Sequence, residues 1–367
     1  MTDGRRRLVV HIGHPKTGTS AIQTFLYANR ELLSERGILY PRESDLIGSQ
    51  HSLAREFEPG YRPPRDALTF AKLALQVEAS DADAFVLSSE QWTARADQAR
   101  AVRGIQEFAE NVGLTVDVIA FVRPQHAYIN SFYTELVKRF HEQRQFRAHS
   151  LEAVERPLLD YAAHLAEWDR PSNMRLVPLA FTRDALQPNL ETAFFDAAGL
   201  SDRVGELLAG GGRFVNTAPG ALAIEVCRRV AVDLASRSEV ETNNRIRMRL
   251  SRTVLRLAKQ RMDWDEAPYN GVDDGLRDQL DAPFSDSNRA FAQRYWGADW
   301  YETFSRDYEA GLIPNEFGGS GTTPRDRRAV ANLTDAAISR VDQALEASSQ
   351  ARSDDRRPPV GTDSSTS

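Results

Sequence analysis

The segment 13–20 near the start of the chain combines the residue types that bind an anion. It follows an apolar run typical of a strand, 8–12, and it precedes apolar residues with helical spacing, which predict a helix over 19–34. A strand that turns through glycine into a helix leaves free backbone N–H groups and the positive end of the helix dipole at the turn, where they attract phosphate or sulfate. Lysine adds a positive charge, and threonine and serine add hydroxyl donors. The candidate binding residues of this loop are His14, Pro15, Lys16, Thr17, Gly18, Thr19 and Ser20.

The two glycines of this loop have the spacing of the P-loop that binds nucleoside triphosphates, G-x-x-x-x-G-K-[ST]. Gly13 and Gly18 match that pattern, but Thr19 stands where the P-loop has its lysine, and Lys16 lies inside the loop. The displacement disfavours an ordinary site for magnesium and a nucleoside triphosphate, while the anion-binding features remain. A glycine-bearing turn without a ligand is the less favoured alternative.

A second anion signal begins at Arg123, which follows the apolar run 114–122. Pro124 suits the first position of a helix. Ser131 lies seven residues beyond Pro124, about two helical turns, and therefore on the same face of that helix. An arginine fork and a serine hydroxyl on one face can hold a second phosphate. An arginine at a strand end is often only an ion-pair partner, so this second motif is weak by itself. It becomes specific only in combination with the loop 13–20.

Continuous apolar runs alternate with helical patterns in the first half of the chain. This alternation predicts an α/β fold, a parallel sheet flanked by helices on both faces, with a mainly helical C-terminal half. In such a sheet, ligands bind at the carboxyl ends of the strands, where the loop 13–20 and Arg123 are expected to meet. The expected organisation is one domain, 1–317, divided into a nucleotide-binding core, 8–185, and a helical acceptor-side portion, 186–317, followed by a linker, a helix and a disordered tail, 318–367.

The two motifs together resemble those of the sulfotransferases that use 3′-phosphoadenosine 5′-phosphosulfate (PAPS), in the carbohydrate-type bacterial branch. A strand–P-K-T-G-T-S–helix element is followed about a hundred residues later by a strand–R-P-x6-S–helix element, and the resemblance covers residues 8–135. It implies the P-loop-like sulfotransferase fold, PAPS as sulfuryl donor, no metal, and a hydroxyl acceptor on a small molecule, a carbohydrate or a glycolipid. It assigns the 5′-phosphosulfate to Lys16, Thr17, Gly18, Thr19 and Ser20, and the 3′-phosphate to Arg123 and Ser131.

Sulfuryl transfer to a hydroxyl requires a general base, because a hydroxyl is a poor nucleophile. Glu90 is the first candidate, since it ends the predicted strand 84–90 and so lies at the same sheet edge. His51, in the predicted long loop 42–65, is the second, because an imidazole titrates near neutral pH. Lys16 is expected to stabilise charge that develops during transfer. Glu90 has a plainer alternative role as an ion-pair partner of a nearby cation or as a helix cap.

Composition limits the remaining possibilities. The chain has 367 residues, a formal net charge of −6 and one cysteine, which argues against general nucleic-acid binding and against a disulfide framework. No apolar stretch approaches the roughly 18 residues of a membrane span, so a cytoplasmic location is expected. Two other functions remain open: a non-catalytic adenosine-phosphate-binding protein of the same fold, and a phosphotransferase that uses a nucleoside triphosphate.

The predicted helix 242–262 carries seven basic residues and no acidic one. An apolar stripe on the same helix predicts that one face packs against the protein. The basic residues then form either a solvated face or a surface that attracts an anionic acceptor or membrane headgroups.

Overall fold

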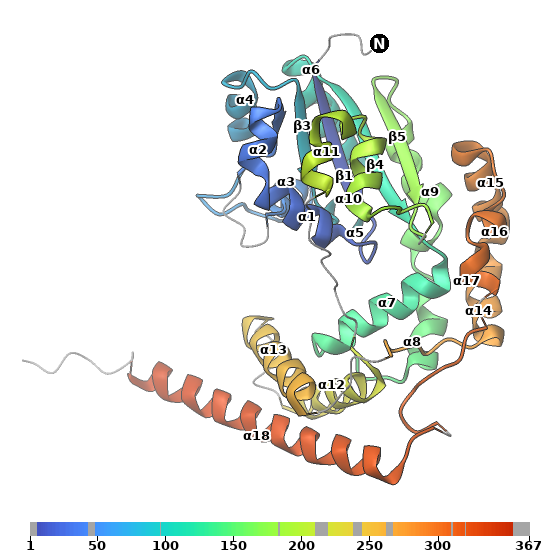
Figure 1. Ribbon diagram of the computed structural model, residues 1–367. Helices are drawn as coiled ribbons and strands as arrows, with labels where there is room; N and C mark the ends of the chain where they lie inside the picture. The colour runs from blue at the N-terminus through green and yellow to red at the C-terminus, as the bar shows by residue number, and fades with distance from the viewer. Residues whose placement is uncertain are drawn as a thin grey trace, which may run out of the picture. The chain divides into compact units, whose positions relative to one another are not determined.

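Five parallel strands form a single sheet with the order β2-β3-β1-β4-β5 (Figure 1). The strands are β1 (Arg7–Gly13), β2 (Ile38–Leu39), β3 (Ala84–Ser88), β4 (Thr115–Val122) and β5 (Met174–Ala180). The structure is a computed structural model, and the predicted α/β class with a parallel sheet is confirmed. It describes residues 6–42, 48–95, 97–182, 184–209, 219–237, 244–261, 267–309, 311–319 and 321–354.

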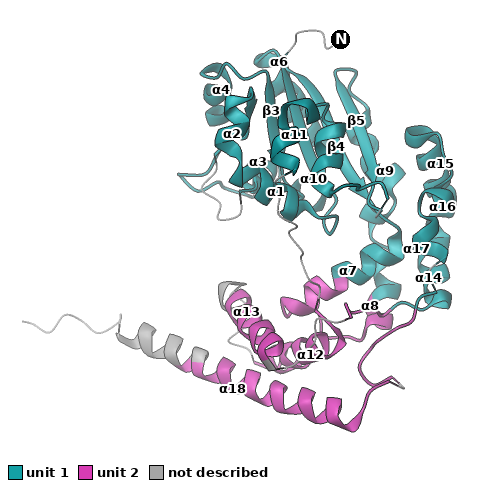
Figure 2. Ribbon diagram, viewed as in Figure 1, with its two compact units in different colours: residues 1–132, 150–215, 272–312 teal, residues 133–149, 216–271, 313–367 magenta. Residues whose placement is uncertain are grey.

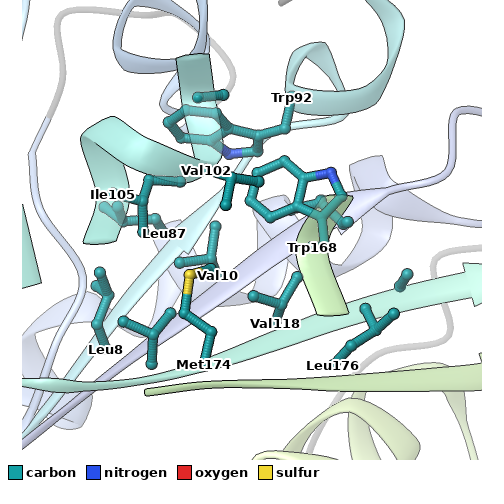
Figure 3. Close-up of a cluster of buried hydrophobic side chains, with 14 of the residues drawn as sticks. Leu8, Val10, Leu87, Trp92, Val102, Ile105, Val118, Trp168, Met174 and Leu176 are labelled. Carbon is teal, nitrogen blue, oxygen red and sulfur yellow. The ribbon is translucent and has the colours of Figure 1, made fainter. Parts of the chain in front are cut away.

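The central strand β1 is buried on both faces, which explains its continuous apolar run. Val10 lies opposite Leu87 of β3 and Val118 of β4. Successive side chains of a strand point to opposite faces, so Val10 enters one hydrophobic cluster and Val9 enters another. Figure 3 shows the first cluster, in which Trp168 lies among the side chains of the sheet.

Two helical layers supply these clusters. One layer contains α1 (Thr19–Ala28), α2 (Arg30–Glu35), α10 (Leu190–Ala197) and α11 (Ser201–Ala209), whose buried side chains pack with Val9. The other layer packs with Val10 and contains α3 (His51–Arg55), α4 (Phe70–Glu78), α5 (Gln91–Ala94), α6 (Gln98–Asn111), α9 (Tyr161–Leu165), η2 (Ala166–Asp169), α15 (Ser285–Trp296) and α16 (Trp300–Thr303). Both faces of the sheet are therefore covered, as parallel sheets require.

Several predicted boundaries are wrong. The single helix expected over 19–34 is divided at Asn29, whose side-chain amide donates to the carbonyl of Phe25 at 2.9 Å and shares that carbonyl with the Asn29 backbone N–H. The expected loop 42–65 contains α3, and its residues 43–47 lie outside the described part of the chain. The helix expected from Pro124 to about Phe146 ends earlier, as α7 (Gln125–Lys138), and a separate helix, α8 (Phe146–Ala153), begins at Phe146.

The second half of the chain is mainly helical, as predicted. Its last helix, α18, continues to Asp354, so it extends into the end of the segment 318–367, for which the sequence predicted a disordered tail. Residues 355–367 lie outside the described part. The remaining helices are η1 (Pro157–Leu159), α12 (Ala221–Ala235), α13 (Asn244–Arg261), α14 (Asp274–Asp281), η3 (Ala282–Phe284), α17 (Ser305–Glu309) and α18 (Pro324–Asp354).

The chain divides into two compact units that alternate along the sequence (Figure 2). Unit 1 comprises 1–132, 150–215 and 272–312 and holds the sheet, and unit 2 comprises 133–149, 216–271 and 313–367. The functional division expected at residue 317 stays a prediction. Within the described residues, none of the helices combines the length and the apolar character that a membrane span needs.

Candidate anion-binding site

The sequence motifs follow three adjacent strands of the sheet, at their carboxyl ends. β1 and β4 are neighbours, but the chain leaves β1 towards β2 and leaves β4 towards β5. Such a reversal of direction opens a crevice outside the strand ends, which is where ligands bind in sheets of this kind. The loop 13–20 follows β1 and Arg123 follows β4, so both anion motifs border this crevice, while Glu90 follows β3 on the other side of β1.

The loop 13–20 reaches α1 through a left-handed turn at Gly18, which has φ +78° and caps the helix. A Cβ on Gly18 would lie 2.3 Å from Cδ2 of Leu190, so both the backbone angle and the packing favour glycine here. No described side chain caps α1, and the Ala21 N–H already donates to the Gly18 carbonyl at 2.9 Å. Thr19 and Ser20 therefore carry the first-turn N–H groups that a ligand can use. The hydroxyl of Thr17 donates to the carbonyl of His14 at 2.6 Å and thereby braces the turn.

The side chains of the loop differ in their access to solvent. Pro15 and Lys16 are half-buried and Ser20 is exposed, whereas Thr17 and Thr19 are buried. The hydroxyl hydrogen of Thr17 is used within the loop, so its backbone N–H is the group that this residue can offer to an anion. Lys16 and Ser20 therefore supply the accessible side-chain donors of the loop.

The side chain of His14 lies in the core, although the sequence placed this residue among the candidates for anion binding. The ring is fully buried, with its centroid 5.0 Å from that of Tyr161 and 5.2 Å from that of His164. Burial, together with the nearby His164, lowers the pKa of His14 to about 3, so the ring is neutral at pH 7. The same burial leaves the ring no route to a ligand above the loop.

Arg123 connects the two anion motifs. Its Nη1 donates to the carbonyl of Lys16 at 3.2 Å, and its own carbonyl accepts the Tyr161 hydroxyl at 2.8 Å. The guanidinium lies 5.5 Å from the ring centre of Phe181, and its Nε is buried and has no hydrogen-bond partner among the residues that the structure describes. Burial lowers the pKa of Arg123, but an arginine still carries its charge at neutral pH. Ser131 lies on α7 and is half-buried.

The two candidate bases, treated as alternatives in the sequence, lie side by side. Nε2 of His51 is 3.7 Å from Oε1 of Glu90, and Nδ1 of His51 is 2.7 Å from the hydroxyl of Ser89. Gln23 of α1 donates to the other carboxylate oxygen of Glu90 at 3.0 Å. The side chains of His51 and Glu90 are 21% and 22% exposed, so both are held in place and still reach solvent.

Contacts of Gln50 and Gly13 position His51 and Glu90. The Gln50 N–H donates to the Ser88 carbonyl at 3.1 Å and the Gln50 side chain accepts from the Ser88 N–H at 2.7 Å, which fastens the start of α3 to the end of β3. A Cβ on Gly13 would lie 3.3 Å from Cβ of Glu90, so the anion loop passes directly beside the carboxylate residue. The base pair and the anion loop are therefore neighbours.

Gln23 is the site residue that sequence reasoning missed. It is buried on the inner face of α1, next to Ile22 and three residues before Leu26. A polar side chain on the apolar face of a helix needs a buried partner. That pattern was a usable signal, although it does not say that the partner is Glu90.

The start of α7 is held by residues far away in the sequence. Asp281 accepts the backbone N–H of His126 at 2.8 Å, the Nδ1–H of the same residue at 2.6 Å, and the hydroxyl of Tyr308 at 2.8 Å. Gln125 and Asn288 exchange two amide hydrogen bonds of 2.8 and 2.9 Å. A carboxylate thus already occupies the first turn of α7, and a phosphate near this helix has to rely on Arg123 and on residues further along.

A pocket of about 490 Å³ lies beyond β5 and contains no residue that the sequence analysis singled out. It begins one residue after Phe181, the ring beside Arg123, and Asp307 on its wall acts electrostatically on that arginine. No local pattern marks it, because its walls come from two distant segments. The lining residues are Thr182, Asp184, Thr303, Phe304, Ser305, Arg306, Asp307 and Glu309.

Within the described residues, no group of three or more His, Cys, Asp or Glu side chains has the arrangement of a metal site. The chain was also compared with known proteins. No family model matches it, and no match was found among the curated proteins.

Proposed function

We propose that this chain is a sulfotransferase that moves the sulfuryl group of PAPS to an acceptor hydroxyl on a carbohydrate or glycolipid. The observation that carries the proposal is the 3.2 Å hydrogen bond from Arg123 to the Lys16 carbonyl, which joins the two anion motifs into one site. A donor with phosphate groups at both its 5′ and 3′ positions needs two such anion-binding elements at close range.

Several groups of the site fit such a donor. The backbone N–H groups of Thr19 and Ser20 at the start of α1 and the positive charge of the half-buried Lys16 can hold the 5′-phosphosulfate, as helix N-termini hold anions elsewhere. The buried Nε of Arg123 has no partner within the described chain, and a 3′-phosphate oxygen would supply one. When bound, PAPS supplies the sulfuryl group and leaves as adenosine 3′,5′-bisphosphate.

The strand order supports an assignment of the two substrates to opposite sides of the loop 13–20. Glu90 and His51 lie on the β3 side of this loop and Arg123 lies on the β4 side. We assign the acceptor hydroxyl to the β3 side and the nucleotide to the β4 side. This arrangement suits a transfer in which the nucleophile and the leaving group lie on opposite faces of the transferred atom.

Glu90 is assigned as the residue that takes the proton of the acceptor hydroxyl. The Gln23 amide holds Oε2 and so orients the carboxylate, leaving Oε1 on the side of His51. The 3.7 Å separation between Oε1 and His51 Nε2 is too long for a hydrogen bond, but contacts of this kind often shorten when substrates bind. His51, held by Ser89, then receives or shares the proton.

The test is to measure transfer of labelled sulfate from PAPS to a library of hydroxyl acceptors, together with calorimetric binding of adenosine 3′,5′-bisphosphate. Glu90→Gln should lower kcat by about 100-fold or more, because general bases contribute at least that much, and should leave nucleotide affinity unchanged. Glu31→Gln, at an exposed carboxylate of α2, is the matched control. A wild-type protein that binds the nucleotide but transfers sulfate to no acceptor would favour a non-catalytic binding protein instead.

A further inference from the structure

Helix α13 in unit 2 has two opposite faces. Leu250, Val254 and Ala258 are buried, and the helix packs against α12 and α18 of the same unit (Figure 2). At 3.6 residues per turn these three side chains fall within an arc of about 80°. The apolar face of α13 is therefore buried in the interior of unit 2.

Four exposed cations occupy the other face of α13, which we call the basic stripe: Arg249, Arg252, Arg256 and Lys259. They also fall within an arc of about 80°, centred opposite the buried face, and they extend over about 15 Å of helix. Helix α13 contains no acidic residue. Within the described chain, no ion pair holds the guanidinium groups of the three arginines.

The charge of the stripe contrasts with that of the whole chain, which is −6. The acidic excess lies in unit 1, because unit 2 outside the stripe carries 17 basic and 17 acidic residues. A flat anionic surface contacts only the face of the protein that carries the stripe. Acidic residues more than about 8 Å from that surface are screened from it at physiological salt. Met248, 45% exposed and next to Arg249, adds an apolar side chain that can enter the headgroup region.

From this contrast we propose that the basic stripe of α13 docks the protein on an anionic lipid surface. The attachment is electrostatic, because the apolar face of α13 is already buried. Clusters of four or more basic residues on a helix bind acidic headgroups, and each contributes roughly a fivefold gain in affinity. The proposal is independent of the sulfotransferase assignment, since no stripe residue belongs to the anion-binding site.

The test is co-sedimentation of the full chain with vesicles of phosphatidylserine and phosphatidylcholine, and with vesicles of phosphatidylcholine alone. The wild type should bind only the acidic vesicles and should be released by about 1 M salt, where the screening length is about 3 Å. Arg252→Gln with Arg256→Gln should weaken binding by about 30-fold. Arg252→Lys with Arg256→Lys should retain most of it, because the charge is kept.

The matched control is Arg325→Gln with Arg328→Gln, which removes the same charge from two exposed positions of α18. This control should bind as the wild type does. Equal losses in both double variants would mean that net charge and not the stripe drives binding, and would overturn the proposal. So would binding to neutral vesicles, or capture by a soluble polyanion such as heparin with no binding to acidic vesicles. Circular dichroism shows whether each variant is folded.

Discussion

Gly18→Ala tests the packing of the anion loop most sharply, because the structure supplies a matched control. Gly18 has φ +78°, and a Cβ there would lie 2.3 Å from Cδ2 of Leu190 and 3.3 Å from Phe181. Gly60 has φ +79°, but a Cβ there would meet nothing within 4 Å. Alanine at Gly60 therefore introduces backbone strain alone, which costs about 1–2 kcal/mol.

Alanine at Gly18 adds steric overlap to the same strain. Overpacking typically costs about 1–3 kcal/mol, so Gly18→Ala should lower the free energy of unfolding by about 2–5 kcal/mol in total. The nearest atom is the end of a flexible side chain, so Gly18→Ala combined with Leu190→Ala should be more stable than the two single effects added together. Because the turn at Gly18 presents the N–H groups of α1, the single variant should also bind adenosine 3′,5′-bisphosphate more weakly.

The assays are urea unfolding and isothermal titration calorimetry of the same preparations. Equal destabilisation by Gly18→Ala and Gly60→Ala would refute the close contact between the loop and α10. If the losses in unfolding free energy caused by Gly18→Ala and Leu190→Ala simply add in the double variant, the Leu190 side chain is not what the new Cβ overlaps. Unchanged nucleotide affinity in Gly18→Ala would refute the role of this turn in anion binding.

Three further predictions concern the groups around the site. Gln23→Met removes the 3.0 Å hydrogen bond to Glu90 and should lower kcat about tenfold or more, with no change in nucleotide affinity, as measured by transfer kinetics and calorimetry. Burial lowers the pKa of His11 and His14 from the ordinary 6.5 to about 3. Between pH 6.5 and pH 3 the unfolded chain therefore binds more protons at these two histidines than the folded protein does. Stability should fall as the pH drops through this range, by about 1.4 kcal/mol per pH unit for each histidine, measured by urea unfolding at a series of pH values. Asp281→Ala leaves two buried donors of His126 and the half-buried Tyr308 hydroxyl without this carboxylate and should cost about 3–5 kcal/mol in the same assay.

Each of these has a result that would contradict it. Wild-type kcat in Gln23→Met would show that the amide does not orient the carboxylate. A free energy of unfolding that stays constant between about pH 6.5 and pH 4 would mean that the buried rings are not held neutral. Asp286, an exposed carboxylate in the following helix, is the control for Asp281. Equal stability of the two alanine variants would contradict the anchoring of α7.

The architecture could be predicted from the sequence because strands that are buried on both faces have continuous apolar sequences. β1, β3 and β4 were all predicted within two residues of their observed ends, and their parallel direction follows from the helices between them. Helix interruptions were less accessible. At the division, the side-chain amide of Asn29 shares the Phe25 carbonyl with the backbone N–H of Asn29, a contact that hydrophobic periodicity does not register.

The candidate site was only partly accessible for a different reason. The parallel sheet fixes the position of residues that directly follow a strand, such as Glu90 and Arg123. Their location at the carboxyl edge of the sheet could therefore be predicted. Contacts across distant segments could not, as the pairing of His51 with Glu90 and the hold of Asp281 on α7 illustrate. The burial of His14 was missed because the pattern of the loop does not say which of its side chains turn inwards.

The most direct test of the central claim is a comparison of nucleotide affinities by calorimetry, with and without magnesium. We expect adenosine 3′,5′-bisphosphate to bind without magnesium and more tightly than adenosine 5′-monophosphate or magnesium-ATP. In Arg123→Gln the advantage over the 5′-monophosphate should disappear, whereas Arg170→Gln, at an exposed arginine of the same unit, should retain it. Tighter, magnesium-dependent binding of ATP to the wild type would contradict the proposed sulfuryl donor.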